Sequence, residues 1–182
     1  MEHRRKSIST ILRLFALAAA FICAAAFAVP AAAENGGVPE RDLYEFSIQA
    51  MEEGKSLRVW GLMRLTYVNR SADTMYSIAL RLHANDADAN CMAIGSVGAD
   101  GRSAAYTLSD DGSILTVSLP REIGPSESTQ LFMRFDMTLP ETGDRFGANS
   151  TGYMLGNALP IAAMYENGAW RTEPYYSNGD SF

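Results

Sequence analysis

From Leu43 onward, apolar and polar residues alternate with a period of two, and this alternation constrains the fold more than any other feature. Between Tyr44 and Ala50 every second residue is apolar, and the residues between them are polar. Such spacing places the apolar side chains on one face of a half-buried strand. The pattern returns after the turn signal at Glu52–Lys55, so residues 44–50 and 57–67 are expected to form a hairpin.

Further strands are expected at 76–82, 93–97, 104–108, 114–119 and 130–138, with Asp-Gly pairs between them and prolines 120 and 140 at their ends. No stretch after residue 33 has the apolar spacing of a helix over three turns. The chain is therefore expected to be all-β, with an antiparallel saddle- or sandwich-like sheet. From Arg145 the alternation is lost, and this segment is expected to wrap the sheet or contact a neighbour.

Residues 1–33 have the pattern of a secretory signal peptide. Basic residues at positions 4–6 precede an apolar stretch from Leu14 to Val29, and Ala31–Ala33 supply the small residues of a cleavage site before Glu34. The mature chain is thus expected to be exported to the cell envelope or the extracellular space, with only transient membrane contact. Without cleavage, the same stretch would anchor the chain in a membrane. Residues 34–41 form a polar lead-in.

The composition of the mature part excludes some functions. Residues 34–182 contain 11 Lys and Arg against 20 Asp and Glu, a net charge of −9, which disfavours binding to nucleic acid or to anionic lipid. Removal of the signal peptide also removes Cys23. Cys91 then has no partner for an internal disulfide and is expected to be a buried or incidental thiol.

The chemistry available to the chain is limited. His83 is the sole histidine after the signal segment, so no site with two histidine ligands is available, and a structural role is expected for it. Asp86–Asn90 resembles the start of a calcium loop, but Cys91 and Val97 stand where glycine and glutamate are needed, so a solvated acidic loop is expected. No catalytic, cofactor-binding or metal-binding residue is predicted.

A series of short motifs runs in one order along the chain. It comprises Leu57-x-x-x-Gly61, Leu65-x-Tyr67-x-Asn69-x-Ser71 with Asp73-Thr74, Leu80-x-Leu82-His83-x-Asn85, Leu139-Pro140, Asp144-Arg145-Phe146-Gly147, Leu155-Gly156-Asn157-x-x-Pro160-Ile161, Tyr165-Glu166-x-Gly168-x-Trp170 and Pro174-Tyr175-Tyr176 with Gly179-Asp180. This series, over residues 42–182, resembles the N-terminal β-domain of the gluzincin aminopeptidases, the membrane alanyl aminopeptidase family, and above all its bacterial exported members.

The resemblance implies a domain that is not catalytic by itself. In the complete protein it would shape the cleft and support a catalytic domain, whose His-Glu-x-x-His motif binds zinc for hydrolysis of peptides from the N-terminus. That motif is missing here, and the chain ends where the family's N-terminal domain adds further strands, so a truncated fragment is expected. Zinc and the main partner, the catalytic domain, would belong to the missing part.

The resemblance and the aromatic C-terminal segment together suggest site residues. The region from Gly156 to Pro160 is similar to a segment near the family's cleft, which makes Tyr153 and Asn157 candidates for cleft lining, with loop packing as the alternative role. A docking face is expected at the aromatic residues Trp170, Tyr175, Tyr176 and Phe182. In the alternative reading, the chain is a free-standing secreted β-sandwich that binds a peptide or protein through the same four residues.

Overall fold

The structure is a computed structural model that describes residues 40–87, 91–141 and 145–173. The expected signal peptide at 1–33 and most of the lead-in at 34–41 lie outside the described residues. In the described part the regular structure is β-strand, apart from the short helix α2 (His83–Ala87). Within that part, no helix has the length and apolar character needed to cross a membrane.

The larger sheet has five antiparallel strands in the order β1, β2, β8, β4, β5. Their bounds are β1 (Leu43–Glu53), β2 (Ser56–Val68), β8 (Ser128–Thr138), β4 (Met92–Ala99) and β5 (Arg102–Ser103). The predicted hairpin is confirmed, because β1 and β2 pair in continuous register from Leu43 opposite Thr66 to Glu53 opposite Ser56. Alternation along β8 buries every second side chain, as the sequence pattern predicts.

The smaller sheet has four antiparallel strands in the order β11, β3, β7, β6. They are β11 (Ile161–Ala162), β3 (Met75–Arg81), β7 (Ile114–Ile123) and β6 (Tyr106–Leu108). The prediction that a strand ends at Pro120 is wrong, since β7 continues through it to Ile123. The register between β3 and β7 shifts in this region, and proline, which has no N–H to donate, is tolerated at such an irregularity.

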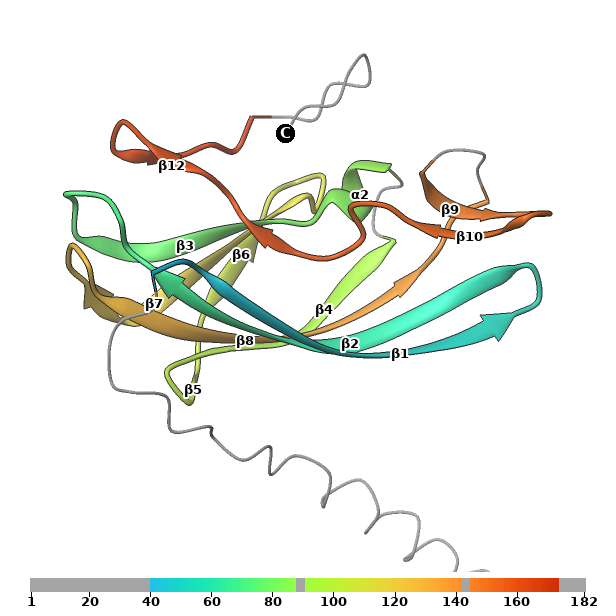
Figure 1. The fold of residues 1–182 in the computed structure, drawn as a ribbon, viewed down its shortest axis with the longest axis horizontal. Helices are drawn as coiled ribbons and strands as arrows, with labels where there is room; N and C mark the ends of the chain where they lie inside the picture. Colours follow the sequence, from blue (N-terminus) through green and yellow to red (C-terminus); the bar gives the residue numbers. More distant parts are fainter. Residues whose placement is uncertain (1–39, 88–90, 142–144, 174–182) are drawn as a thin grey trace, which may run out of the picture. The chain divides into compact units, whose positions relative to one another are not determined.

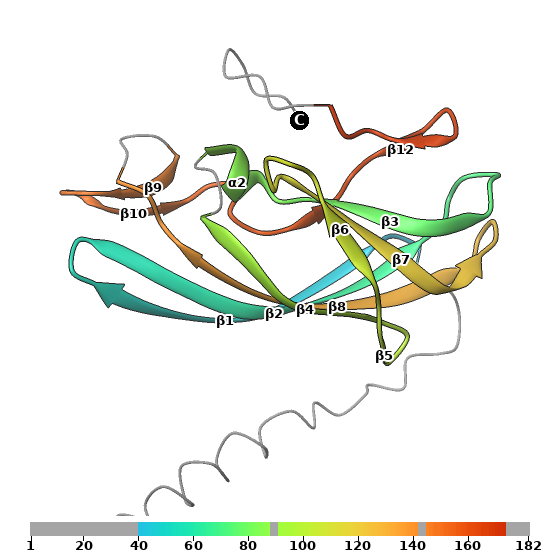
Figure 2. The ribbon, with the colours of Figure 1, turned by 180° about the vertical axis from the view of Figure 1, so that it is seen from behind.

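The two sheets form two layers with the core between them. Figures 1 and 2 show the five-stranded sheet as one curved layer, with β3, β7 and β6 over part of one face. Over another part lie α2 and the hairpin of β9 (Phe146–Asn149) and β10 (Gly152–Leu155). Side chains from both sheets fill the space between, among them Met63, Leu65, Ile78, Leu80, Leu115, Val117, Leu131, Met133 and Met137. The prediction of an all-β, antiparallel fold is confirmed.

The acidic segment after β3 differs from the expected solvated loop. It begins with the single turn of α2, and the Asp86 side chain is only 6% exposed because it contacts His83. Residues 88–90 lie outside the described part. A helix of five residues is too short to leave an apolar periodicity in the sequence, which is why the alternation did not reveal it.

The C-terminal segment folds into short pairs of strands. β9 (Phe146–Asn149) pairs with β10 (Gly152–Leu155), and β12 (Tyr165–Glu166) pairs with β13 (Ala169–Trp170). Between these hairpins, β11 joins the smaller sheet beside β3. The segment therefore wraps the sheets, and it brings β12 to the end of the molecule that carries the turn between β2 and β3 (Figure 1).

Candidate binding groove

A groove with a volume of about 380 Å³ lies between the start of β1, the end of β2 and the segment from β11 to β12. Three separate parts of the chain line it: Asp42, then Tyr67, Arg70, Ser71 and Met75, then Ala162, Ala163, Met164 and Tyr165. The size is within the range of small-molecule sites, about 300–1,000 Å³. This groove is the candidate binding site.

One wall of the groove is held by Asn69, which is fully buried at the end of β2. Its side-chain nitrogen donates to the carbonyl oxygens of Asp73 at 2.7 Å and Ile123 at 3.1 Å, and its side-chain oxygen accepts from the backbone nitrogen of Ser71 at 3.0 Å. These bonds fix the turn between β2 and β3, and with it Arg70.

Arg70 forms an ion pair with Asp42 in the groove, with a distance of 2.8 Å between the guanidinium and the carboxylate. The same carboxylate oxygen accepts from the backbone nitrogen of Val68 at 3.0 Å. The guanidinium also donates to the carbonyl oxygen of Glu40 at 3.2 Å. The groove lining therefore contains one positive and one negative side chain, which balance each other.

Two tyrosine hydroxyls near the groove have protein partners. The Tyr44 hydroxyl accepts from the backbone nitrogen of Ala162 at 2.9 Å, and the Tyr165 hydroxyl donates to the Asp73 carboxylate at 3.2 Å. Burial is the main cause of the raised pKa of Tyr44, and burial followed by the bond to Asp73 raises the pKa of Tyr165. Both phenols are therefore neutral at ordinary pH.

The third tyrosine, Tyr67, is different because its hydroxyl has no hydrogen-bond partner among the described residues. Its side chain lies on the core face of β2, and the whole residue is only 7% exposed. Its ring packs against Trp170, with 5.7 Å between ring centroids. Burial, and next the nearby carboxylate of Asp42, raise the pKa of Tyr67 to about 12, so the hydroxyl remains a hydrogen-bond donor.

The two residues expected to line a cleft lie in and after the β9–β10 hairpin. Tyr153 is on β10 and is 37% exposed, whereas Asn157 follows the strand with φ at 58°. Asparagine tolerates this left-handed conformation better than most residues. Neither residue belongs to the groove, and their assignment to a cleft stays a prediction.

Among the four residues expected to form a docking face, the structure describes Trp170; the other three, Tyr175, Tyr176 and Phe182, lie outside the described residues. Trp170 is half-buried on β13, and its ring meets that of Tyr165 edge-on at 5.0 Å. Because the ring packs inward against two tyrosines, only part of it is available to another protein.

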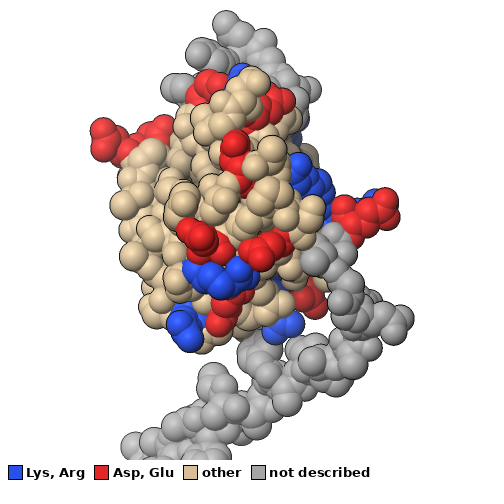
Figure 3. Space-filling model, turned by 90° about the vertical axis from the view of Figure 1, so that its left-hand side faces the viewer, with Lys and Arg blue, Asp and Glu red and all other residues tan. Residues whose placement is uncertain are grey.

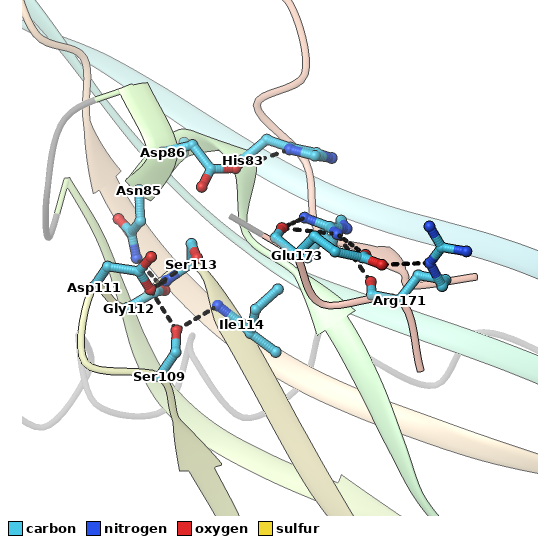
Figure 4. Close-up of polar contacts among 12 residues, drawn as sticks. His83, Asn85, Asp86, Ser109, Asp111, Gly112, Ser113, Ile114, Arg171 and Glu173 are labelled. Carbon is cyan, nitrogen blue, oxygen red and sulfur yellow. Dashed lines mark hydrogen bonds and ion pairs between the residues drawn. The ribbon is translucent and has the colours of Figure 1, made fainter. Parts of the chain in front are cut away.

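A second polar cluster surrounds α2 and is drawn in Figure 4. His83 Nδ1 and the Asp86 carboxylate are 3.0 Å apart, and both side chains are buried. Asn85 donates to the carbonyl oxygens of Met92 at 3.1 Å and Gly112 at 2.8 Å, so it connects α2 to β4 and to the turn before β7. The expected structural role of His83 agrees with these contacts.

The turn at Asp111 completes the cluster (Figure 4). Its carboxylate accepts from the hydroxyls of Ser109 at 2.5 Å and Ser113 at 2.8 Å and from the Ser113 backbone nitrogen at 3.0 Å, and these bonds lower the pKa of Asp111. Such bonds stabilise the turn.

The family resemblance implies zinc for the complete protein. In the parts of the chain that the structure describes, no group of three or more His, Cys, Asp and Glu side chains could hold a metal ion. The sequence has two histidines, His3 and His83, and neither is followed by glutamate.

Charged side chains of both signs lie at this end of the molecule. Figure 3 faces the end that carries β12 and shows acidic and basic side chains side by side on a mostly uncharged surface. Opposite charges at short range cancel much of each other's field, so this face would not steer strongly charged ligands.

The groove was not among the sites expected from the sequence. Tyr67 and Tyr165 belong to the quoted motifs, but alternation assigns Tyr67 to the core. The opposite wall, Ala162–Tyr165, is almost a hundred residues away in sequence, so no local signal connects the two. The sequence gives one hint of the groove. Tyr67 and Tyr165 stand in separate motifs, and Asn69-Arg70 follows the first of them.

The chain is similar to solved structures of M1 zinc metallopeptidases. One is a mutant from Deinococcus radiodurans bound to a Tyr-Ser-Ala substrate, with 18% identity and a TM-score of 0.43 over 54% of this chain and 20% of that chain. Another is a two-domain mutant bound to L-tryptophan, with 17% identity and a TM-score of 0.40 over 56% and 21%. The chain thus spans about a fifth of their length, and such TM-scores do not establish a shared fold. No family model and no curated protein matches the chain.

Proposed function

We propose that this chain is the N-terminal β-domain of an exported, M1-like zinc metallopeptidase and has no catalytic activity by itself. In the complete protein, the domain shapes one side of the peptide cleft and supports the catalytic domain. The observation that carries the proposal is the motif series, which occurs in one order from Leu57 to Asp180. The signal-peptide pattern of residues 1–33 supports export.

Residues of the series occupy positions where the fold needs those residue types. Asn69 and Asn85 are buried, and each joins two separate parts of the chain through side-chain hydrogen bonds. A Cβ on Gly156 would lie 2.9 Å from the carbonyl oxygen of Arg145, so this position requires glycine. These three members of the series therefore stand at positions where this fold depends on the residue type, which supports the resemblance.

The partner in this proposal is the catalytic domain of the same protein. Trp170, Tyr175, Tyr176 and Phe182 would contribute to the contact, since aromatic side chains are enriched at such interfaces. Zinc and the residues that activate water would come from that domain, through its His-Glu-x-x-His motif. Tyr153 and Asn157 would lie on the cleft side.

The first test is to read the coding sequence beyond the codon for Phe182. An in-frame continuation that encodes His-Glu-x-x-His, with a glutamate further on, is the expected result. A stop codon with no such motif downstream would overturn the proposal.

The second test uses the purified full chain. With added zinc it is expected to release no product from a panel of aminoacyl p-nitroanilides, and metal analysis is expected to find no stoichiometric zinc after dialysis. Turnover that a chelator abolishes would show that the chain itself is an enzyme. N-terminal sequencing of the exported protein is expected to find Glu34, within a few residues, as the first residue.

A further inference from the structure

The Tyr67 hydroxyl is the polar group of the groove whose bonding is incomplete within the described residues. The residue as a whole is more than nine-tenths buried, but its hydroxyl is not among the buried side-chain polar atoms that have no partner, so this hydroxyl reaches the open space of the groove. By contrast, the Tyr44 and Tyr165 hydroxyls are already used in bonds to the protein. A ligand in the groove would therefore meet one preorganised donor.

The charges near Tyr67 indicate the kind of acceptor that this donor suits. Arg70 and Asp42 lie 2.8 Å apart and neutralise each other, so the groove offers no uncompensated charge to a carboxylate or an ammonium group. A ligand carboxylate would also meet the repulsion of Asp42. A neutral carbonyl oxygen accepts a hydrogen bond from a phenol, needs no opposite charge in the groove and is not repelled by Asp42.

Apart from Ser71, the rest of the groove is apolar. Met75, Ala162, Ala163 and Met164 line it, and Met164 is 60% exposed. Methionine adapts its shape to different aliphatic groups. A carbonyl oxygen beside an aliphatic side chain is the repeating chemistry of a peptide with apolar residues.

We propose that this groove binds a neutral peptide segment, in which an aliphatic side chain contacts Met75, Ala163 and Met164 and a backbone carbonyl accepts a hydrogen bond from the Tyr67 hydroxyl. This site does not include Tyr153 or Asn157, but it adjoins the expected aromatic docking face, because the Trp170 ring packs on Tyr67 and Tyr165. It is also independent of the catalytic domain, since every group that it uses lies in this chain.

The test titrates the ¹⁵N-labelled full chain with N-acetyl-leucinamide and follows amide signals by NMR. The expected result is a Kd of about 1–10 mM, with the largest shifts at Ala162–Met164. N-acetyl-glutamic acid amide and N-acetyl-lysinamide, which carry one charge each, are expected to bind at least fivefold more weakly. Tighter binding of either charged probe would overturn the assignment to neutral peptides, and no shift at these amides up to 50 mM probe would overturn the site.

Tyr67→Phe is the matched variant, because it removes the hydroxyl and retains the ring that packs on Trp170. It is expected to weaken binding of N-acetyl-leucinamide by about five- to tenfold. Tyr106→Phe, on β6 and outside the groove lining, is expected to change the Kd by less than about twofold. Equal binding by the two variants would show that the Tyr67 hydroxyl is not the donor.

Met164→Asp gives a second measure that does not depend on a buried position. Met164 is exposed, so the substitution is expected to leave the fold intact while it adds a negative charge to the apolar wall. Binding of N-acetyl-leucinamide is expected to fall at least fivefold. Unchanged binding would exclude this wall from the site.

Discussion

Asn69 is the residue on which the β2–β3 turn most depends. It is fully buried and donates to the carbonyl oxygens of Asp73 and Ile123. Replacement by alanine removes both donors, so Asn69→Ala is expected to destabilise the domain by about 2–4 kcal/mol. Urea unfolding followed by circular dichroism measures this loss. The matched control is Asn149→Ala, because Asn149 is exposed and its side chain bonds only within its own hairpin, to Thr151 and to the Met154 sulfur; less than ~1 kcal/mol is expected there. Similar losses in the two variants would contradict the role assigned to Asn69.

At the same scale, the sequence identifies residues better than it identifies their contacts. The turn at 69–73 follows from its composition, but the bond from Asn69 to Ile123 joins residues 54 positions apart. Tyr67 is similar: alternation places it in the core, as observed, whereas the groove beside its hydroxyl exists because Ala162–Tyr165 returns to the end of β2. The sequence pattern therefore predicts the turn at Asn69 and the core position of Tyr67, but it does not predict the distant residues that each of them contacts.

The β1–β2 hairpin owes its close packing to a glycine. A Cβ on Gly61 would lie 2.8 Å from the Ser47 carbonyl oxygen and 2.9 Å from a ring carbon of Phe135. Backbone cannot move aside as a flexible side chain can, so Gly61→Ala is expected to destabilise the domain by about 1–3 kcal/mol. On β4, a Cβ on Gly95 would meet nothing closer than 3.5 Å, and Gly95→Ala is expected to change stability by no more than ~0.5 kcal/mol. Thermal unfolding of both variants makes the comparison. Equal melting temperatures would mean that the hairpin accommodates the methyl group.

Elements with local signals were predicted well, and those set by packing were not. The long strands β2 and β8 show alternation over many residues, which fixes both their extent and their buried face. Pro120 suggests a strand end because it lacks an N–H, but the irregular register opposite β3 removes the need for that donor. The short helix α2 buries Ala84 and Asn85, and Asn85 bonds to β4 and to the turn before β7, contacts that no local pattern shows.

For the whole molecule, sequence reasoning gives the layer type but not the order of strands. Short alternating strands predict an antiparallel fold, yet β8 lies between β2 and β4, next to partners far away in sequence. The candidate groove depends on this arrangement, because its lining comes from the start of β1, the end of β2 and the segment after β11. These three segments meet only in the folded chain, so the sequence pattern of each one does not predict the groove that they form together.

The tyrosines in and beside the groove predict how the stability of the whole domain responds to alkaline pH. Burial raises the pKa of Tyr67 from 10.0 to about 12, and the pKa values of Tyr44 and Tyr165 are raised as well. Below pH 10 these phenols are protonated in both the folded and the unfolded chain, so their contribution to stability is fully present. Between pH 10 and 12 the unfolded chain releases protons that the folded chain retains, and the free energy of unfolding falls as the pH rises.

Tyr67→Phe separates this contribution from the other groups that titrate at high pH. Phenylalanine has no proton to lose, so the variant is expected to lose stability less steeply above pH 10, by up to about 1.4 kcal/mol per pH unit. Urea unfolding at pH 8, 9, 10 and 11 measures the two slopes. Tyr106→Phe is the matched control, since Tyr106 is partly exposed on β6, and its slope is expected to follow that of the unmodified chain. If Tyr67→Phe instead follows the unmodified chain above pH 10, the Tyr67 phenol titrates in the folded chain as it does in water, and burial of the residue does not raise its pKa.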